Sequence, residues 1–388
     1  MVDRNRHRCA LLAAALLLSV PVLPARADPP AAAPIGAAAP GLQAVQHDGD
    51  VELPEFAFRN GEHLAPLRLH YTALGTPQRD AGGKITNAVL LLHATTGTGK
   101  TFLVPTLANH LFGPGQPLDV QRYYVVLPDG IGFGGSTKPS DGMHGRFPHY
   151  GYRDQVEAQH AMLQAMGIDH LRLVAGISQG GMQTWLWAEQ HPDAMDGVMP
   201  IACMPMQISG RNLMWRQIVA DAVRSDPKWN GGEYDRADPP TAWTRSAALM
   251  FALMVGTPER LQAAGPDRAK TLAYEDELTA QYRGRDAGDA LYDYESSADY
   301  DPAPDVARIK APMLAINFAD DQVNPAQLPV ARETVASLPS GHFVLLPGGW
   351  GHAGIFHADL WADQLGTFLG SLPGQRDSAT SKSVASGK

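Results

Sequence analysis

The chain has 388 residues, of which 44% are hydrophobic and 18% charged, so a sizeable core can form and global disorder is not expected. The formal net charge of −9 argues against nucleic-acid binding, for which clustered Lys and Arg supply the affinity. Neither cysteine sits in a metal-ligand spacing, and no metal-binding motif is present. We therefore expect no metal, no cofactor and no nucleic-acid partner.

The first 27 residues have the three parts of a secretory signal. They comprise a basic start, an apolar stretch from Ala10 to Leu23, and Ala25-Arg26-Ala27 with small residues where a signal peptidase cuts. The apolar stretch is shorter than the roughly 20 residues of a membrane-spanning helix, so an uncleaved membrane anchor is the weaker alternative. We expect residues 1–27 to be removed and the mature protein to be periplasmic or secreted, without a membrane partner.

Short apolar runs then alternate with helical patterns along most of the chain. Strands that alternate with helices predict a mostly parallel sheet with helices on both faces. The alternating segment 52–71 is expected to add antiparallel edge strands. The predicted strands are 89–92, 123–127, 171–175, 197–202, 313–318 and 342–346, and the clearest helices are 156–166 and 182–190.

The stretch 204–304 breaks this rhythm, because its pattern is helical and includes several Trp and Met residues but no clear strand. Its flanks lack the composition of a linker, so a helical cap inserted into the sheet domain is preferred over a separate helical domain. The core is then expected at 46–203 and 305–372. A flexible lead-in at 28–45, which begins rich in Ala and Pro, precedes it, and a disordered tail at 373–388 follows.

A candidate nucleophile follows the strand predicted at 171–175. Gly176-Ile177-Ser178-Gln179-Gly180 matches G-x-S-x-G and precedes a predicted helix. A serine on a sharp strand-to-helix turn is strained, so residues two positions away must be tiny. This placement favours Ser178 as a nucleophile over an inert glycine-rich turn.

A serine nucleophile needs a general base, which an acid orients. Where the nucleophilic serine lies on such a strand-to-helix turn, the order along the chain is Ser, then Asp or Glu, then His. The strand predicted at 313–318 runs into Asp320 and Asp321, and we favour Asp321, partly on the family resemblance given below. His352 follows the last predicted strand among glycines that let its loop reach the site. We therefore expect His352 to be the base.

The loop after the strand at 89–92 allows two interpretations. In the first, the backbone N–H groups of Thr95 and Gln179 form an oxyanion hole that stabilises developing negative charge. In the second, Ala94 to Thr101, which reads A-T-T-G-T-G-K-T, is a phosphate-binding loop. The second is disfavoured because the first glycine of that motif is replaced by Ala94.

Several segments together carry a family resemblance: His93-Ala94-x-Thr96-Gly97, Asp129-Gly130-x-Gly132, Ser136-x-Lys138-Pro139-Ser140, Ser178-x-Gly180-Gly181-Met182-Gln183 and Asp226-Pro227-x-Trp229-Asn230-Gly231-Gly232. On these segments the chain resembles the homoserine O-acetyltransferase family of α/β-hydrolases, over about residues 52–369. The resemblance implies an α/β-hydrolase fold with a helical cap, an acyl-serine intermediate and a triad of Ser178, Asp321 and His352. It also places Arg216 near the substrate as a carboxylate-holding residue, the alternative being a solvated helix position. Two residues depart from the family pattern. Gln179 stands after the nucleophile, where the family usually has Met, and Ala353 stands after the catalytic histidine, where the family usually has an acid.

The predicted export decides the order of the functional hypotheses. An exported enzyme meets excess water and little coenzyme A thioester, so we first expect a serine hydrolase that cleaves an ester or related acyl bond. The alternative is an O-acyltransferase of the homoserine O-acetyltransferase type, which differs only in the second nucleophile. A binding protein with an inactive triad is the non-enzymatic alternative. The expected partner is a small-molecule acyl substrate, and a homodimer is left open.

Overall fold

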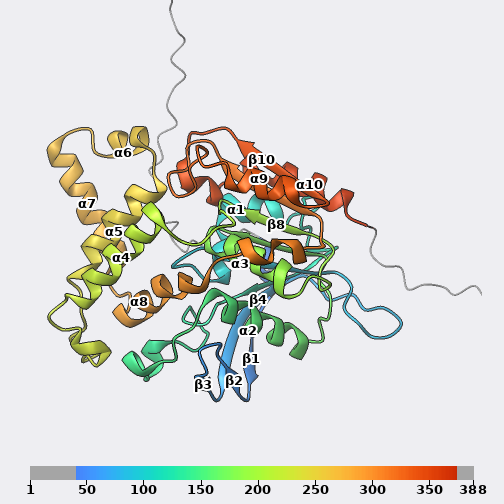
Figure 1. Ribbon diagram of the computed structural model, residues 1–388, viewed down its shortest axis with the longest axis horizontal. Helices are drawn as coiled ribbons and strands as arrows, with labels where there is room; N and C mark the ends of the chain where they lie inside the picture. Colours follow the sequence, from blue (N-terminus) through green and yellow to red (C-terminus); the bar gives the residue numbers. More distant parts are fainter. Residues whose placement is uncertain (1–40, 374–388) are drawn as a thin grey trace, which may run out of the picture.

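The computed structural model describes residues 41–373, which contain an eight-stranded sheet with helices on both faces (Figure 1). The expected signal, most of the lead-in and all but the first residue of the tail lie outside the described residues. In spatial order the strands are β1 (Gln46–Leu53), β4 (Leu67–Leu74), β6 (Tyr124–Pro128), β5 (Ala88–Leu92), β7 (Leu173–Ile177), β8 (Val198–Ile201), β9 (Met313–Phe318) and β10 (Gly341–Leu346).

Six neighbouring strands, from β6 to β10, run parallel, whereas β4 pairs antiparallel with both β1 and β6. This confirms the expected mostly parallel sheet and its antiparallel edge. A separate two-stranded hairpin joins β2 (Phe56–Ala57) to β3 (His63–Leu64). Part of the expected lead-in is ordered, because Leu42–Ala44 form a 3-10 helix in which Leu42 is buried.

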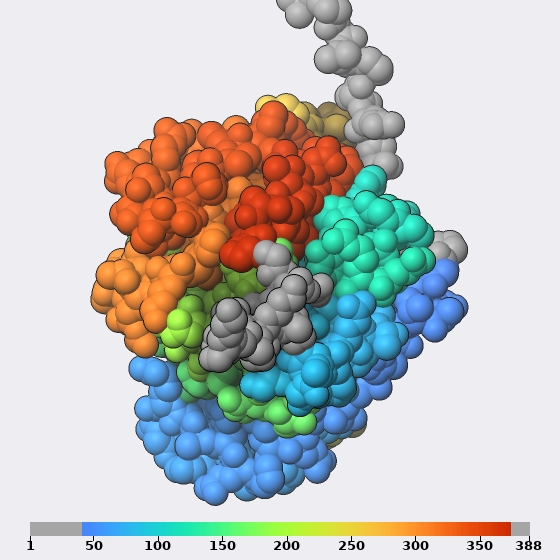
Figure 2. All heavy atoms as spheres, turned by 90° about the vertical axis from the view of Figure 1, so that its right-hand side faces the viewer, coloured from blue at the N-terminus to red at the C-terminus, as the bar shows by residue number. Residues whose placement is uncertain are grey.

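The helices of the core lie in two layers. One face of the sheet packs against α2 (Tyr152–Ala165), α3 (Gln179–Gln190) and α9 (Val330–Ser337), and the other against α1 (Pro105–Leu111) and α10 (Ala362–Ser371). In the side view, the C-terminal segment (red) lies beside the region of α1 (teal), in agreement with the contacts between them (Figure 2). No helix within residues 41–373 is long and apolar enough to cross a membrane.

The central strands are buried on both faces, which explains their continuous apolar sequence. In β7, Val174 packs into one core cluster while its neighbours Leu173 and Ala175 pack into the other. This alternation follows from the two-residue period of a strand. It anchors the turn after β7 at the carboxyl edge of the sheet, where ligands bind in such folds.

Between β8 and β9 the chain forms a helical insert, which lies on the left of Figure 1. The insert has an apolar cluster of its own that includes Val223, Trp243 and Tyr282. The side chains of Met214 and Leu253 in the insert are exposed. The homodimer that the sequence analysis left open is not tested by the structure of a single chain and stays a prediction. The helices of the insert are α4 (Gly210–Arg224), α5 (Trp243–Val255), α6 (Pro258–Ala264), α7 (Arg268–Tyr282) and α8 (Ala287–Glu295).

Candidate active site

Ser178 stands at the tip of a tight turn between β7 and α3. Its backbone has φ 53° and ψ −111°, a conformation that L-residues adopt only when the surrounding structure holds it. A Cβ on Gly176 would lie 2.2 Å from the carbonyl oxygen of Gly180, and one on Gly180 would lie 2.0 Å from that of Leu92. The two glycines are therefore required sterically, and they leave the Ser178 hydroxyl at the edge of the sheet.

The structure brings the three residues of the predicted triad together. Ser178 Oγ lies 2.8 Å from His352 Nε2, and His352 Nδ1 lies 2.8 Å from Asp321 Oδ2. The Nδ1–H of His352 donates to Asp321, which leaves Nε2 free to accept the proton of Ser178. His352 and Asp321 are 3% and 1% exposed, so water barely screens this chain of hydrogen bonds.

Asp321 is held as an anion by several donors. Its Oδ1 accepts from the backbone N–H groups of Val323 and Asn324, and its Oδ2 accepts from the Asn324 side-chain amide at 3.1 Å. Burial by itself would raise the pKa of Asp321, but the charge of His352 and these hydrogen bonds outweigh it, and the pKa lies below its ordinary value. Asn324 was not identified from the sequence. The one feature that could have indicated it is its position three residues after Asp321.

Asp320, the competing acid, has a different task. Its Oδ2 accepts from the backbone N–H groups of Gly349 and Gly351, at 2.6 and 3.1 Å. Asp320 therefore shapes the loop that carries His352, whereas Asp321 contacts the imidazole itself. The two neighbours point in different directions because they lie at a turn after β9.

The two backbone groups expected to form the oxyanion hole are free to bind a ligand. Within residues 41–373, neither the N–H of Thr95 nor that of Gln179 donates to a protein acceptor. Gln179 is the first residue of α3, so its N–H belongs to a helix terminus that favours negative charge. The Gln179 side chain is fully buried, and neither polar atom of its amide has a hydrogen-bond partner in this part of the chain.

The segment that resembles a phosphate-binding loop is arranged differently from one. Lys100 turns away to pair with Asp48 on β1, at 2.9 Å. Asp129 accepts from the backbone N–H groups of Gly99 and Gly135, so its carboxylate is already engaged. His93 supports the loop, since its Nδ1–H donates to the Ala94 carbonyl and its Nε2 accepts from Gly130 N–H. The phosphate-binding alternative therefore has no support in the structure.

A second buried carboxylate reaches the same loop from the insert. Asp293, on α8, accepts the backbone N–H of Thr96 at 3.0 Å through its Oδ2. Burial raises the pKa of Asp293 to about 7, although the charge of Arg216 and the Thr96 hydrogen bond oppose the rise. Sequence reasoning missed Asp293, because 197 positions separate it from Thr96; the one local signal is an acid between Tyr292 and Tyr294.

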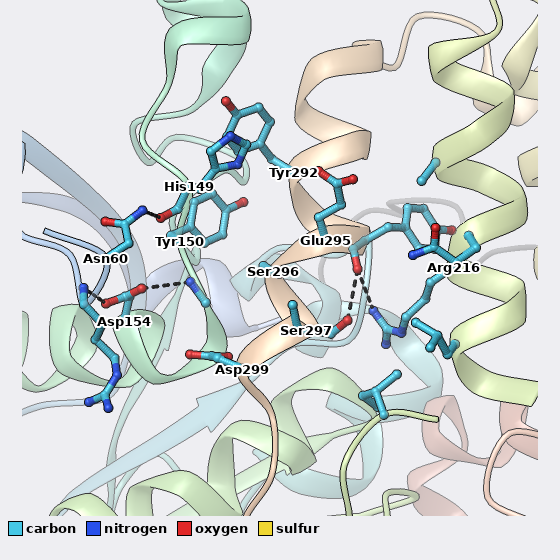
Figure 3. A pocket seen from close by; sticks show the side chains of 18 of the residues that line it. Asn60, His149, Tyr150, Asp154, Arg216, Tyr292, Glu295, Ser296, Ser297 and Asp299 are labelled. Carbon is cyan, nitrogen blue, oxygen red and sulfur yellow. Dashed lines mark hydrogen bonds between the residues drawn. The ribbon is translucent and has the colours of Figure 1, made fainter. Parts of the chain in front are cut away.

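Arg216 lies on α4 of the helical insert. It is 5% exposed, and its guanidinium donates to the Asn212 side chain. It also donates to the backbone carbonyl of Tyr294, the bond drawn from Arg216 in Figure 3. It lines a cavity of about 640 Å³ between the insert and the hairpin side of the core, and no triad residue lines that cavity. His149 and Tyr292 stack on its wall with ring centroids 4.9 Å apart.

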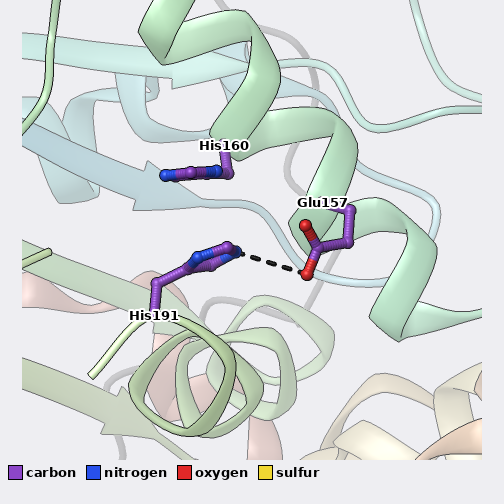
Figure 4. A group of neighbouring side chains, drawn as sticks. All are labelled: Glu157, His160 and His191. Carbon is purple, nitrogen blue, oxygen red and sulfur yellow. Dashed lines mark ion pairs between the residues drawn. The ribbon is translucent and has the colours of Figure 1, made fainter. Parts of the chain in front are cut away.

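One cluster in the described part of the chain has the composition of a metal site. Glu157 and His160 project from α2 toward His191 at the end of α3 (Figure 4). The two imidazole rings are stacked, with centroids 3.8 Å apart and planes 19° apart, so their in-plane lone pairs run side by side instead of converging on one point. His191 also faces the Glu157 carboxylate at 3.4 Å. This cluster is a stacked contact between helices that also contains an ion pair.

Comparisons with known proteins agree with this geometry. Residues 87–359 match the family described as alpha/beta hydrolase fold. The chain is 36% identical to a homoserine O-acetyltransferase of Gluconobacter oxydans over 45% of its own length, and the match spans about half of that relative, 46%. It is 30% identical to a homoserine O-succinyltransferase of Magnetococcus marinus, over 63% of this chain and 70% of the relative.

A solved structure of an acetylester hydrolase from Corynebacterium glutamicum has the same fold, with a TM-score of 0.73 and 22% identity. The superposition covers 84% of this chain and 96% of the other. The matched family, the relatives and the fold together support an enzyme that transfers acyl groups or hydrolyses esters. The comparisons thus agree with the resemblance to homoserine O-acetyltransferases seen in the sequence.

Proposed function

Because the chain belongs to the α/β-hydrolase fold family, we propose that it transfers an acyl group through Ser178 to the hydroxyl of a small acceptor of the homoserine type. The observation that carries this proposal is the line of contacts from Ser178 Oγ to His352 to Asp321, with both links at 2.8 Å. This arrangement allows a serine hydroxyl to lose its proton as it attacks a carbonyl carbon.

The proposed first half-reaction forms an acyl-serine. Ser178 Oγ bonds to the acyl carbon while His352 Nε2 takes the hydroxyl proton, and Asp321 stabilises the resulting imidazolium. The carbonyl oxygen becomes an oxyanion that accepts hydrogen bonds from the backbone N–H groups of Thr95 and Gln179. The bond to the leaving group then breaks, and the leaving group takes the proton from His352.

The second half-reaction decides between transfer and hydrolysis. A hydroxyl of the acceptor, or water, gives its proton to His352 and attacks the acyl carbon. The bond from that carbon to Ser178 Oγ then breaks, and His352 returns the proton to Ser178 Oγ. Transfer is supported by the relatives in sequence, which are homoserine O-acyltransferases. The sequence alone favoured hydrolysis because of the predicted export. Hydrolysis remains the second candidate, because Ala353 follows the histidine and because the predicted export would place the protein in excess water.

Export itself is part of this proposal and rests on the first 27 residues of the sequence. Expression of the full chain in a Gram-negative host, followed by mass spectrometry of the periplasmic fraction, tests it. We expect a mature N-terminus at Asp28. Full-length protein that stays in the cytoplasm would contradict export and leave the acyl chemistry to be tested separately.

The acyl chemistry is tested with p-nitrophenyl acetate as the donor, with and without homoserine. Transfer predicts that homoserine raises the rate of turnover and appears as its O-acetyl ester by mass spectrometry. Release of acetate alone, at a rate independent of homoserine, would establish hydrolysis. Failure of Ser178 to react with a fluorophosphonate probe would favour the non-enzymatic alternative. The Ser178→Ala protein is the control for background reaction in each assay.

A further inference from the structure

Asp293 is joined to the oxyanion loop although it belongs to the helical insert. We propose that Asp293 is a positioning residue that holds the loop carrying Thr95 in the conformation that stabilises the oxyanion. The observation behind this inference is the hydrogen bond from Thr96 N–H to Asp293 Oδ2 at 3.0 Å, made by a carboxylate that is 2% exposed. The inference rests on the proposed acyl chemistry at Ser178, and it adds a residue that the sequence motif does not contain.

Two planar peptide units flank the Cα of Thr95, and each has its own anchor. The unit before it is fixed through the Ala94 carbonyl, which accepts from His93 Nδ1–H at 2.9 Å and from Gly97 N–H at 3.0 Å. In a trans peptide the N–H points opposite to the carbonyl, so the N–H of Thr95 is directed away from these donors. The unit after it is fixed through Thr96 N–H by Asp293. The core therefore anchors one side of Thr95, and the insert anchors the other.

The loop needs this second anchor because Thr96 is strained. Its φ of 61° lies in the left-handed region, which β-branched residues adopt rarely and only when their surroundings impose it. A carboxyl oxygen of Asp293 accepts the N–H of Thr96 in either protonation state, and the bond is strongest when the carboxyl group is ionised. Without this bond, Thr96 would be expected to return to the ordinary backbone region and to turn the adjoining peptide units.

A purely stabilising role does not explain Asp293. Within residues 41–373, Arg216 and Arg285 lower the pKa of Asp293 through their charges alone, without an ion pair to it. Its Oδ1 has no hydrogen-bond partner there. Burying a carboxylate with so few partners costs stability, and an apolar side chain of similar size usually costs less. Its one hydrogen bond therefore points to a role in the loop that it contacts.

The test compares two near-isosteric replacements. Asp293→Leu removes the acceptor without leaving a charge, and we expect kcat to fall by about 10- to 100-fold with KM within twofold, since one misplaced oxyanion donor costs up to about 1,000-fold. Asp293→Asn keeps an acceptor oxygen but not its charge, and we expect kcat to fall by about three- to tenfold. Unchanged kcat in D293L would overturn the proposal, because this variant has no acceptor for Thr96 N–H. If D293L fails to fold, Asp293→Ala, which also removes the acceptor, decides it in the same way.

Asp289 provides the matched control, one helical turn earlier on α8. It also reaches into the core, where it accepts from the backbone N–H and the hydroxyl of Ser140, at 2.8 and 2.7 Å. Asp289→Leu should lower the melting temperature but leave kcat within about threefold, because its partner lies outside the oxyanion loop. A loss of kcat in D289L equal to that in D293L would assign both effects to general damage of the insert and overturn the positioning role.

Labelling by a fluorophosphonate separates this proposal from the function on which it rests. If wild-type Ser178 is not labelled, the acyl chemistry itself is absent. If wild-type Ser178 is labelled and D293L is labelled at the same rate, the acyl chemistry stands and the role of Asp293 is refuted. Labelling that is slower by about the same factor as the loss in kcat supports both.

Discussion

The core and the helical insert each supply one fully buried carboxylate to the same site, and the two carboxylates have opposite surroundings. Asp321, after β9, is surrounded by donors from Val323, Asn324 and His352, and its pKa is lowered. Within residues 41–373, Asp293 on α8 has a single hydrogen bond, and its pKa is raised to about 7. The core thus holds Asp321 as a fully paired anion, while the insert contributes a carboxyl group with few partners that gains and loses its proton near neutral pH.

This contrast teaches where each kind of effect should arise. The triad residues of the core perform the chemical step, so their loss should abolish activity with little change in fold. Residues of the insert face a cavity and the oxyanion loop, so their loss should change rate or affinity by smaller factors. Five substitutions test this division, and two of them, at Asp320 and Glu189, are changes in the core outside the triad.

Ser178→Ala removes the nucleophile. We expect kcat for p-nitrophenyl acetate to fall by about 10⁵- to 10⁶-fold, as for other serine enzymes whose nucleophile is removed, with an unchanged melting temperature because alanine fits the same turn. The measurement is a steady-state assay with purified protein and a thermal melt. Activity above about 1% of wild type would show that the acyl group does not pass through this serine.

Asp321→Asn and Asp320→Asn form the sharpest pair, because they are neighbours with different partners. D321N presents an amide to His352 Nδ1 and favours the wrong imidazole tautomer, so we expect kcat to fall by about 10⁴-fold. D320N retains an oxygen that accepts from Gly349 and Gly351, and we expect at most about a tenfold loss. Equal losses in the two variants would mean that the His352 loop, and not its tautomer, limits the rate.

Arg216→Gln addresses the substrate role that the resemblance implies for this residue. If the cavity beside it receives the carboxylate of the acceptor, KM for homoserine should rise by about 10- to 100-fold while kcat with saturating acceptor changes little. Hydrolysis of p-nitrophenyl acetate in the absence of acceptor serves as the control and should not change. An unaltered KM for homoserine would leave Arg216 as a structural residue that binds Asn212 and the Tyr294 carbonyl.

Glu189→Gln has the smallest expected effect on activity and tests the core away from the site. Glu189 is fully buried on α3, 3.4 Å from Arg153, and burial raises its pKa to about 8. A raised folded-state pKa contributes stability that is complete below the unfolded value and is lost as the pH rises toward about 8.

Urea unfolding at pH 5 and pH 9 measures this effect. The wild-type free energy of unfolding should fall more than that of E189Q between the two pH values, by on the order of 1–3 kcal/mol. The same pH dependence in both proteins would show that Glu189 is ionised in the folded state at ordinary pH. Activity at pH 7 should be similar in both, because Glu189 does not contact the site.

The sequence predicted the core of the fold and the order of the site residues well, for reasons that can be stated locally. Buried parallel strands read as continuous apolar runs, and their boundaries in the structure lie within two residues of the predicted ones. The turn around Ser178 requires glycine at Gly176 and Gly180, so its sequence reports its backbone directly. Helix α3 begins at Gln179, three residues before the apolar pattern indicated, because the turn itself opens the helix.

Local sequence was therefore enough to predict the strand-to-helix turn at Ser178, the alternation of strands and helices, and the helical character of the insert. Each of these features depends on residues within a few positions of one another. Tertiary structure alone decided which of Asp320 and Asp321 meets His352, where Arg216 lies, and that Asp293 holds Thr96. Those outcomes depend on contacts between segments up to 197 positions apart, and no local pattern of side chains specifies how an insert packs onto a loop.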